Sequence, residues 1–153
     1  MDGVIAPDGR NDLYEADEHA WLLRQIAALQ AGRPHELDTP NLVEFLESMA
    51  RRDVREMRSR LARLLQHMLK FTFQPGRASH SWAKTVLHQQ AELRDIVEQA
   101  SMRQEALHRL EAAYDLARRY AVIETGLAAT AFPTDNPWTL DEALHWTPPE
   151  RAE

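Results

Sequence analysis

The stretch Asn41–Phe71, which reads NLVEFLESMARRDVREMRSRLARLLQHMLKF, decides the fold class of this sequence. It contains no glycine or proline and is rich in leucine, arginine, glutamate and methionine, which are good helix formers. Its apolar residues recur at intervals of three and four, the spacing of one face of a helix. We predict one helix roughly 45 Å long, and the alternative is a break near Ala50 that would give two ordinary helices. The members of the apolar stripe are Leu46, Ala50, Val54, Met57, Leu61, Leu64 and Met68.

Another helix, over about residues 13–31, is predicted to precede the long one. Asp12 and Glu15 have the spacing of a capping box at its start. Gly32 is predicted to end it, because glycine readily adopts the left-handed conformation that often follows a helix. The apolar stripe that we expect to face the core consists of Leu22, Ile26 and Leu29.

Three more helices are predicted after a loop at residues 74–79. They cover about residues 80–96, 101–124 and 140–145, and Gly126 is expected to close the second of them. Serine, threonine and acidic or amide residues at a spacing of three mark the starts of such helices. The expected caps are Ser79 or Ser81, Ser101 with Gln104, and Thr139 with Glu142.

The fold class predicted from these signals is all-α. No segment alternates between polar and apolar residues, and no Asn-Gly or Asp-Gly turn marks a hairpin. We expect a helical bundle of four to five helices with one long central helix. A single helical domain should span residues 12–146, between segments 1–11 and 147–153 that are expected to be frayed.

Composition excludes several classes of protein. The 153 residues include no cysteine, which rules out a disulfide scaffold, a thiol nucleophile and a thiolate metal site. No apolar run approaches the roughly 20 residues that a membrane span needs. The formal net charge is −6, and the start of the chain lacks the basic and apolar segments of a secretory signal. These properties predict a cytoplasmic protein with no membrane partner.

Two polar stripes on the long helix are candidate sites. In each, polar side chains three and four residues apart share one helical face. The first stripe could form the floor of a pocket, and the imidazole of the second could be a ligand or a proton carrier. The structural alternatives are a solvated face or hydrogen bonds between helices for the first stripe, and a half-buried imidazole that satisfies one carbonyl group for the second. The lysine could bind an anion or favour the negative end of the helix. The residues are Asn41, Glu44 and Ser48 in the first stripe, and His67, Lys70 and Gln74 in the second.

Six arginines against two acidic residues between positions 51 and 63 form a basic segment in an otherwise acidic chain. Clustered arginine residues favour the binding of nucleic acid, because arginines that neutralise phosphates release the counterions condensed on them. A solvated face paired with the chain's own acidic residues is the alternative. The candidate binding residues of this face are Arg51, Arg52, Arg55, Arg58 and Arg63. Arg60 is the sixth arginine of the segment and is not one of these candidates.

Signatures of metal or catalytic chemistry are not found in the sequence. None of the seven histidines lies three or four residues from another, and the motifs of serine nucleophiles and phosphate-binding glycine loops are missing. We therefore predict no metal, no cofactor and no assigned catalytic residue.

Short motifs along the chain nevertheless resemble a known family. They occur in order and cover about residues 12–146. The chain is similar to the bacterial family of domains of unknown function numbered 29, and the resemblance implies an all-α fold without implying a reaction. The motifs are Leu13-Tyr14-Glu15-Ala16-Asp17 with Trp21, Glu36-Leu37-Asp38, Asn41-Leu42-Val43-Glu44, His67-Met68-Leu69-Lys70 with Gln74-Pro75, Ser81-Trp82, Tyr114, Phe132-Pro133 and Asn136-Pro137-Trp138-Thr139-Leu140.

Three functions stay open at this stage. The first is a non-enzymatic protein-interaction module or homo-oligomer, for which the long helix and the segregated charge argue. The second is a nucleic-acid-binding accessory that uses the face from Arg51 to Arg63. The third is a hydrolytic enzyme that uses Glu44 and His67, which point about 140° apart on a continuous helix.

Overall fold

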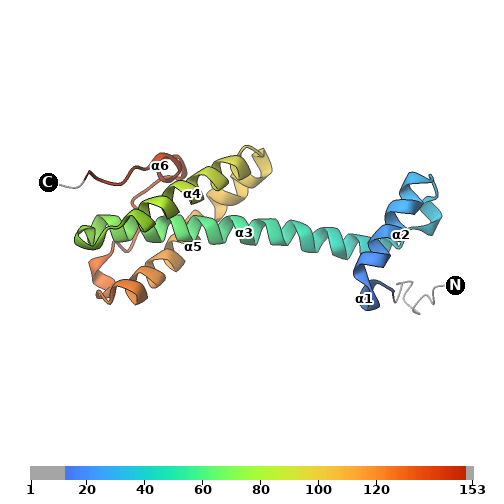
Figure 1. The fold of residues 1–153 in the computed structure, drawn as a ribbon, viewed down its shortest axis with the longest axis horizontal. Helices are drawn as coiled ribbons and strands as arrows, with labels where there is room; N and C mark the ends of the chain where they lie inside the picture. Colours follow the sequence, from blue (N-terminus) through green and yellow to red (C-terminus); the bar gives the residue numbers. More distant parts are fainter. Residues whose placement is uncertain (1–12, 151–153) are drawn as a thin grey trace. The chain divides into compact units, whose positions relative to one another are not determined.

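The computed structural model describes residues 13–150, and every regular element in this part of the chain is helical. This confirms the all-α prediction. Figure 1 shows the order of the elements, in which six α-helices are joined by loops and by three single turns of 3-10 helix. The α-helices are α1 (Leu13–Ala16), α2 (Glu18–Gln30), α3 (Thr39–Phe73), α4 (His80–Val97), α5 (Ala100–Thr125) and α6 (Leu140–His145). The 3-10 turns are η1 (Pro34–Glu36), η2 (Pro75–Arg77) and η3 (Ala129–Ala131).

The helix α3 runs without interruption for 35 residues, so the prediction of one long helix is confirmed and the alternative break near Ala50 is wrong. Pro40 lies in its first turn, where a missing N–H group forfeits no helical hydrogen bond. Pro75 opens η2 just after its end, and proline disfavours the helical conformation in the residue before it. Between these two prolines nothing in the sequence breaks the helix.

The first predicted helix is divided in two at Asp17. This residue has a non-helical backbone, with φ −154° and ψ 83°, and its Oδ1 accepts a hydrogen bond from the Ala20 N–H group at 3.0 Å. It therefore caps α2, and the predicted cap Asp12 lies outside the described residues. Gly32 has φ 66° after the end of α2, as predicted.

Most of the other predicted helix ends are confirmed. The Ser79 hydroxyl caps α4, Thr139 and Glu142 form a capping box at α6, and Gly126 ends α5 in the left-handed conformation with φ 69°. The predicted capping box of Ser101 is wrong, because α5 already begins at Ala100 after the extended residue Gln99.

The chain groups into two compact units, Met1–Arg52 and Asp53–Glu153, which we describe separately as the N-terminal unit and the C-terminal unit. The boundary falls within α3. One domain over residues 12–146 stays a prediction. Most of the terminal segments that were expected to be frayed lie outside the described residues, and residues 147–150 contain no helix.

The C-terminal unit has a well-packed core. The second part of α3 supplies Met57, Leu61, Leu64 and Met68, the later members of the predicted stripe, all of them fully buried. Helix α5 presents a run of alanines, which allows neighbouring helices to approach closely. Three carbonyl groups at α6 accept hydrogen bonds from Gln90 and Arg94 of α4, so this short helix is held by side chains as well as by burial. The α5 residues in the core are Ala106, Leu110, Ala113, Tyr114, Ala117 and Ala121.

The N-terminal unit is different, because few of its apolar residues are buried. Trp21 is fully buried and contacts the rings of Tyr14 and Phe45, with ring centroids 4.6 and 5.8 Å apart. Among the described residues of this unit, Ala28 is the other buried hydrophobic residue. The inward side of α2 is therefore formed by Trp21, Gln25 and Ala28.

Two predicted core stripes need correction in this unit. Ile26 and Leu29 are exposed, and Leu22 is half-buried, because α2 turns the neighbouring side of the helix inward. Likewise Leu46 is 60% exposed, whereas the later members of the same α3 stripe are buried from Met57 onward. The periodic stripe is real, but neighbouring helices cover only part of it.

We expect Leu93→Ala to destabilise the C-terminal unit by about 2–5 kcal/mol, because it leaves a cavity at a fully buried position. Leu87→Ala, at an exposed position of the same helix, should change the free energy of unfolding by no more than about 0.5 kcal/mol. Urea unfolding followed by circular dichroism measures both, and similar losses in the two variants would contradict the described packing of α4.

Candidate functional site

A groove of about 400 Å³ lies between α3 and α5 in the C-terminal unit and is lined by two of the predicted site residues, Arg63 and His67. The α3 residues recur at intervals that place them on one side of that helix, and the α5 residues are four apart, so two helical faces form the walls. The lining residues are Ser59, Ala62, Arg63, Gln66, His67, Leu116, Tyr120 and Glu124.

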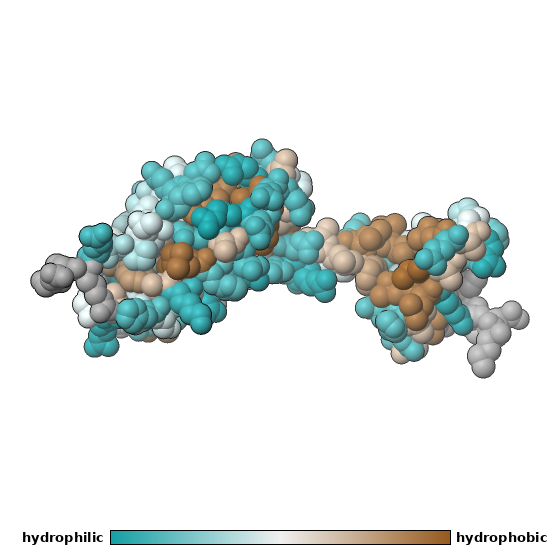
Figure 2. Space-filling view, turned by 45° about the horizontal axis from the view of Figure 1, so that its top comes forward, coloured by the Kyte–Doolittle hydropathy of each residue, from teal (hydrophilic) through white to brown (hydrophobic). Residues whose placement is uncertain are grey.

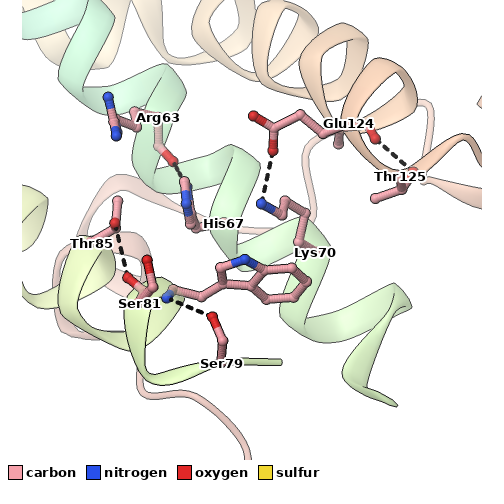
Figure 3. A network of polar contacts seen from close by, with 10 residues as sticks. Arg63, His67, Lys70, Ser79, Ser81, Thr85, Glu124 and Thr125 are labelled. Carbon is pink, nitrogen blue, oxygen red and sulfur yellow. Dashed lines mark hydrogen bonds and ion pairs between the residues drawn. The ribbon is translucent and has the colours of Figure 1, made fainter. Parts of the chain in front are cut away.

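The imidazole of His67 is held in one tautomer. Its Nδ1 lies 2.9 Å from the carbonyl oxygen of Arg63 one turn earlier (Figure 3). A carbonyl oxygen only accepts hydrogen bonds, so this contact assigns the proton to Nδ1 and leaves Nε2 as an acceptor in the neutral ring. Burial lowers the pKa of His67 below its ordinary value of 6.5; the hydrogen bond to Arg63 opposes this, and the charges of Lys70 and Arg63 add to it.

Lys70, another predicted site residue, is paired within the chain. Its Nζ lies 2.8 Å from Oε2 of Glu124 on α5 and 4.2 Å from the ring centroid of Trp82 on α4. Burial alone would raise the pKa of Glu124, but the hydrogen bond and charge of Lys70 lower it below its ordinary value, with help from Gln66. A buried ammonium needs such a partner, and Figure 3 shows the carboxylate of Glu124 directed at it.

The other predicted site residues are not gathered in this groove. Gln74 is half-buried just after the end of α3. Asn41, Glu44 and Ser48 belong to the N-terminal unit, so the proposed hydrolytic pair of Glu44 and His67 is divided between two compact units. Residues 13–150 contain no group of three or more side chains that could hold a metal ion.

Asn41 is part of a buried network that holds the N-terminal unit together. The Oδ2 of Asp38 accepts hydrogen bonds from Trp21 Nε1 and from Asn41 Nδ2, both at 2.8 Å. The Asp38 N–H group donates to Oε1 of Gln25, also at 2.8 Å. The sequence marked Asn41 as a candidate, but the central position of Asp38 was missed, because its partners lie up to 17 residues away in the sequence.

The arginine face is largely retained in the structure. Arg51, Arg52, Arg55, Arg58 and Arg63 are exposed, although Arg51 donates to Ser48 and lies 3.9 Å from Glu47. Arg60 does not belong to this face. It is half-buried, with contacts of 2.9 Å to Glu56 and 3.8 Å to Glu92, and it donates to Gln89.

A surface that the apolar periodicity does not predict lies on the N-terminal unit. We call it the apolar face, and Figure 2 shows brown, hydrophobic residues gathered over this unit. Its members were missed because three of them had been assigned to the core by their spacing. It comprises Leu23, Ile26 and Leu29 of α2 and Val43, Leu46 and Met49 of α3, which are between 38% and 60% exposed.

Fold and surfaces together define an all-α protein with a well-packed C-terminal unit and an N-terminal unit whose apolar residues are largely uncovered. The family model described as "Domain of unknown function DUF29" matches residues 13–147, so the chain belongs to this family. This agrees with the resemblance seen in the sequence motifs. No curated protein and no solved structure matches the chain.

We expect His67→Gln to reduce the loss of stability in mild acid. Because burial holds the pKa of the folded imidazole below 6.5, the unfolded chain binds a proton that the folded chain does not, and the free energy of unfolding falls as pH decreases through 6.5. In the variant this decline should be weaker. Urea titrations at a series of pH values measure it, with His108→Gln at an exposed site of α5 as the control. Equal slopes for wild type and His67→Gln would contradict the prediction.

Proposed function

We propose that this chain is a non-enzymatic protein-interaction module that binds through the apolar face of its N-terminal unit. The observation that carries the proposal is an imbalance between buried and exposed residues. The described part of the unit, residues 13–52, buries Trp21 and Ala28 and exposes six large hydrophobic side chains. An isolated exposed leucine is ordinary, whereas a group of six on two helices is typical of a contact surface.

The size of the surface supports this proposal. Six large side chains that are about half exposed present on the order of 600 Å² of apolar area. The largest patch on a typical monomeric protein is about 300–600 Å² and is often functional. The apolar face is therefore at the upper end of what a chain without a partner leaves in water.

The groove between α3 and α5 supports an enzymatic function less well. The charge of Lys70 is matched by Glu124, and the Nδ1 of His67 bonds to a backbone carbonyl instead of a carboxylate that would stabilise an imidazolium. The ion pair of Lys70 with Glu124 fixes α3 against α5, and the contact of His67 lies within α3 itself. They favour a structural role for the second polar stripe.

The arginine face is the surface that would serve the alternative function, nucleic-acid binding. Its exposed arginines would interact with phosphates, and the affinity would then fall steeply with salt. The net charge of −6 acts against this, because an acidic protein repels a polyanion at long range. Nucleic-acid binding is therefore the less favoured function, and it predicts retention of nucleic acid instead of protein.

We also propose the cytoplasm as the compartment in which the module works. None of the helices between residues 13 and 150 is long and apolar enough to cross a membrane. The proposal itself rests on composition: a chain without cysteine gains nothing from an oxidising compartment.

Replacing Leu46 by glutamate should weaken protein binding by at least about tenfold, because the contact would then bury an unpaired charge. The full chain is immobilised, exposed to an extract of the source cells, and the retained protein, including further copies of the chain, is quantified. Leu87→Glu introduces the same charge at an exposed leucine of the C-terminal unit and should bind like the wild type.

Equal retention of protein by the wild type and by Leu46→Glu would contradict the proposed function. Retention of nucleic acid that falls with salt and is lost in a variant with Arg55→Glu and Arg58→Glu would favour the nucleic-acid alternative instead.

A further inference from the structure

We infer that the apolar face of the N-terminal unit binds the same face of a second copy of this chain, so that α2 and the first part of α3 from two copies form a four-helix bundle. The inference rests on the proposed function and names its partner. Each copy contributes Leu23, Ile26, Leu29, Val43, Leu46 and Met49 to the contact.

The small core of the N-terminal unit is the first reason. Its described part has about forty residues, and below roughly 40 residues a chain usually needs a metal, a disulfide or oligomerisation to stay folded. The chain has no cysteine, and its described residues contain no metal-ligand group. The buried hydrogen bonds from Trp21 and Asn41 to Asp38 orient the helices, but each such bond adds only about 1 kcal/mol net. A second apolar layer would add the burial of apolar side chains that the described part of this unit lacks.

The chemistry of the face is compatible with binding an identical face. At about 100° per residue, Arg24 of α2 points about 160° away from Ile26. On α3, Glu44 points about 160° away from Leu46, and Glu47 lies at the edge of the face, about 40° from Val43. Charged side chains therefore lie behind the apolar residues or at their edge, where they stay in contact with water when two identical faces meet. Burial of a charge would oppose such a contact by several kcal/mol.

The area agrees with a pair of identical chains. If each copy covers about 600 Å², the contact removes about 1,200 Å² in total, the lower end of stable and specific interfaces. A two-fold arrangement is isologous, so each face covers the other and no apolar face is left to recruit a third copy. Pairs of helices that pack in two layers form a four-helix bundle, which is a common architecture for such faces.

Sedimentation equilibrium of the purified full chain tests this inference. The wild type should have the mass of two chains, which dissociate on dilution. Leu46→Glu and Ile26→Glu should have the mass of one chain, with helix content retained by circular dichroism. Leu87→Glu, at an exposed position of α4, should remain a two-chain species.

Cysteine cross-linking gives a second test that does not depend on a destabilising charge. Because the chain has no cysteine of its own, a single cysteine can form a disulfide only between copies. Four variants with a single cysteine in the apolar face are oxidised by air, with Leu87→Cys as the control. The four are Ile26→Cys, Val43→Cys, Leu46→Cys and Met49→Cys. At least one of the four should cross-link at least about tenfold faster than the control, because a two-fold axis brings a residue near its own copy and a disulfide needs Cα atoms about 4.4–6.8 Å apart.

The outcomes separate this inference from the proposed function. A wild type that has the mass of one chain at all concentrations overturns the inference, while retention of another protein that depends on Leu46 would leave the proposed function intact. A two-chain species that persists in both glutamate variants, or a species larger than two chains, also overturns the inference. If Leu46→Glu retains protein like the wild type and also remains a two-chain species, both the proposed function and this inference are overturned.

Discussion

The apolar stripe along α3 is the constraint on which the rest of the structure depends. A helix of 35 residues with large side chains on one side must remove that side from water or leave it open for a partner. In the C-terminal unit, Met57, Leu61, Leu64 and Met68 belong to one core with residues of α4, α5 and α6. In the N-terminal unit, Leu46 is mostly exposed. The apolar side of α3 is therefore buried in the C-terminal unit and exposed in the N-terminal unit. This difference separates the packed core of the protein from its proposed contact surface.

The buried polar residues of both units follow the same physical rule. The Nζ of Lys70 lies over the ring of Trp82 and pairs with Glu124, and the Nδ1–H group of His67 donates a hydrogen bond to a backbone carbonyl. Asp38 accepts from two side-chain donors. Each group has the partner that burial demands, since an unpaired polar group away from water is costly. Two residues of the polar stripes, Asn41 and Lys70, therefore link α3 to residues outside it.

Much of the helical framework was predictable, because its signals are local. The length of α3 follows from the lack of breakers between Pro40 and Pro75, and the capping box of Thr139 follows from a spacing of three residues. Errors occurred where two local signals competed. The predicted first helix is divided at Asp17, which caps α2, and the predicted cap Ser101 lies inside a helix that starts at Ala100. The exposure of the arginine face was predicted as a whole, except that Arg60 pairs with Glu92, a residue 32 positions later in the sequence.

The sequence by itself determined which segments are helical and where most of them end, because propensity, proline, glycine and caps act over a few residues. It also determined that α3 carries a periodic apolar side. Only the tertiary structure decided which parts of such sides are covered, because burial depends on which segments from elsewhere in the chain lie against them. Leu46 and Leu61 have equivalent places in the pattern, yet one is 60% exposed and the other is fully buried. The tertiary structure therefore defines the apolar face, three of whose six residues have a spacing that predicts them to be in the core.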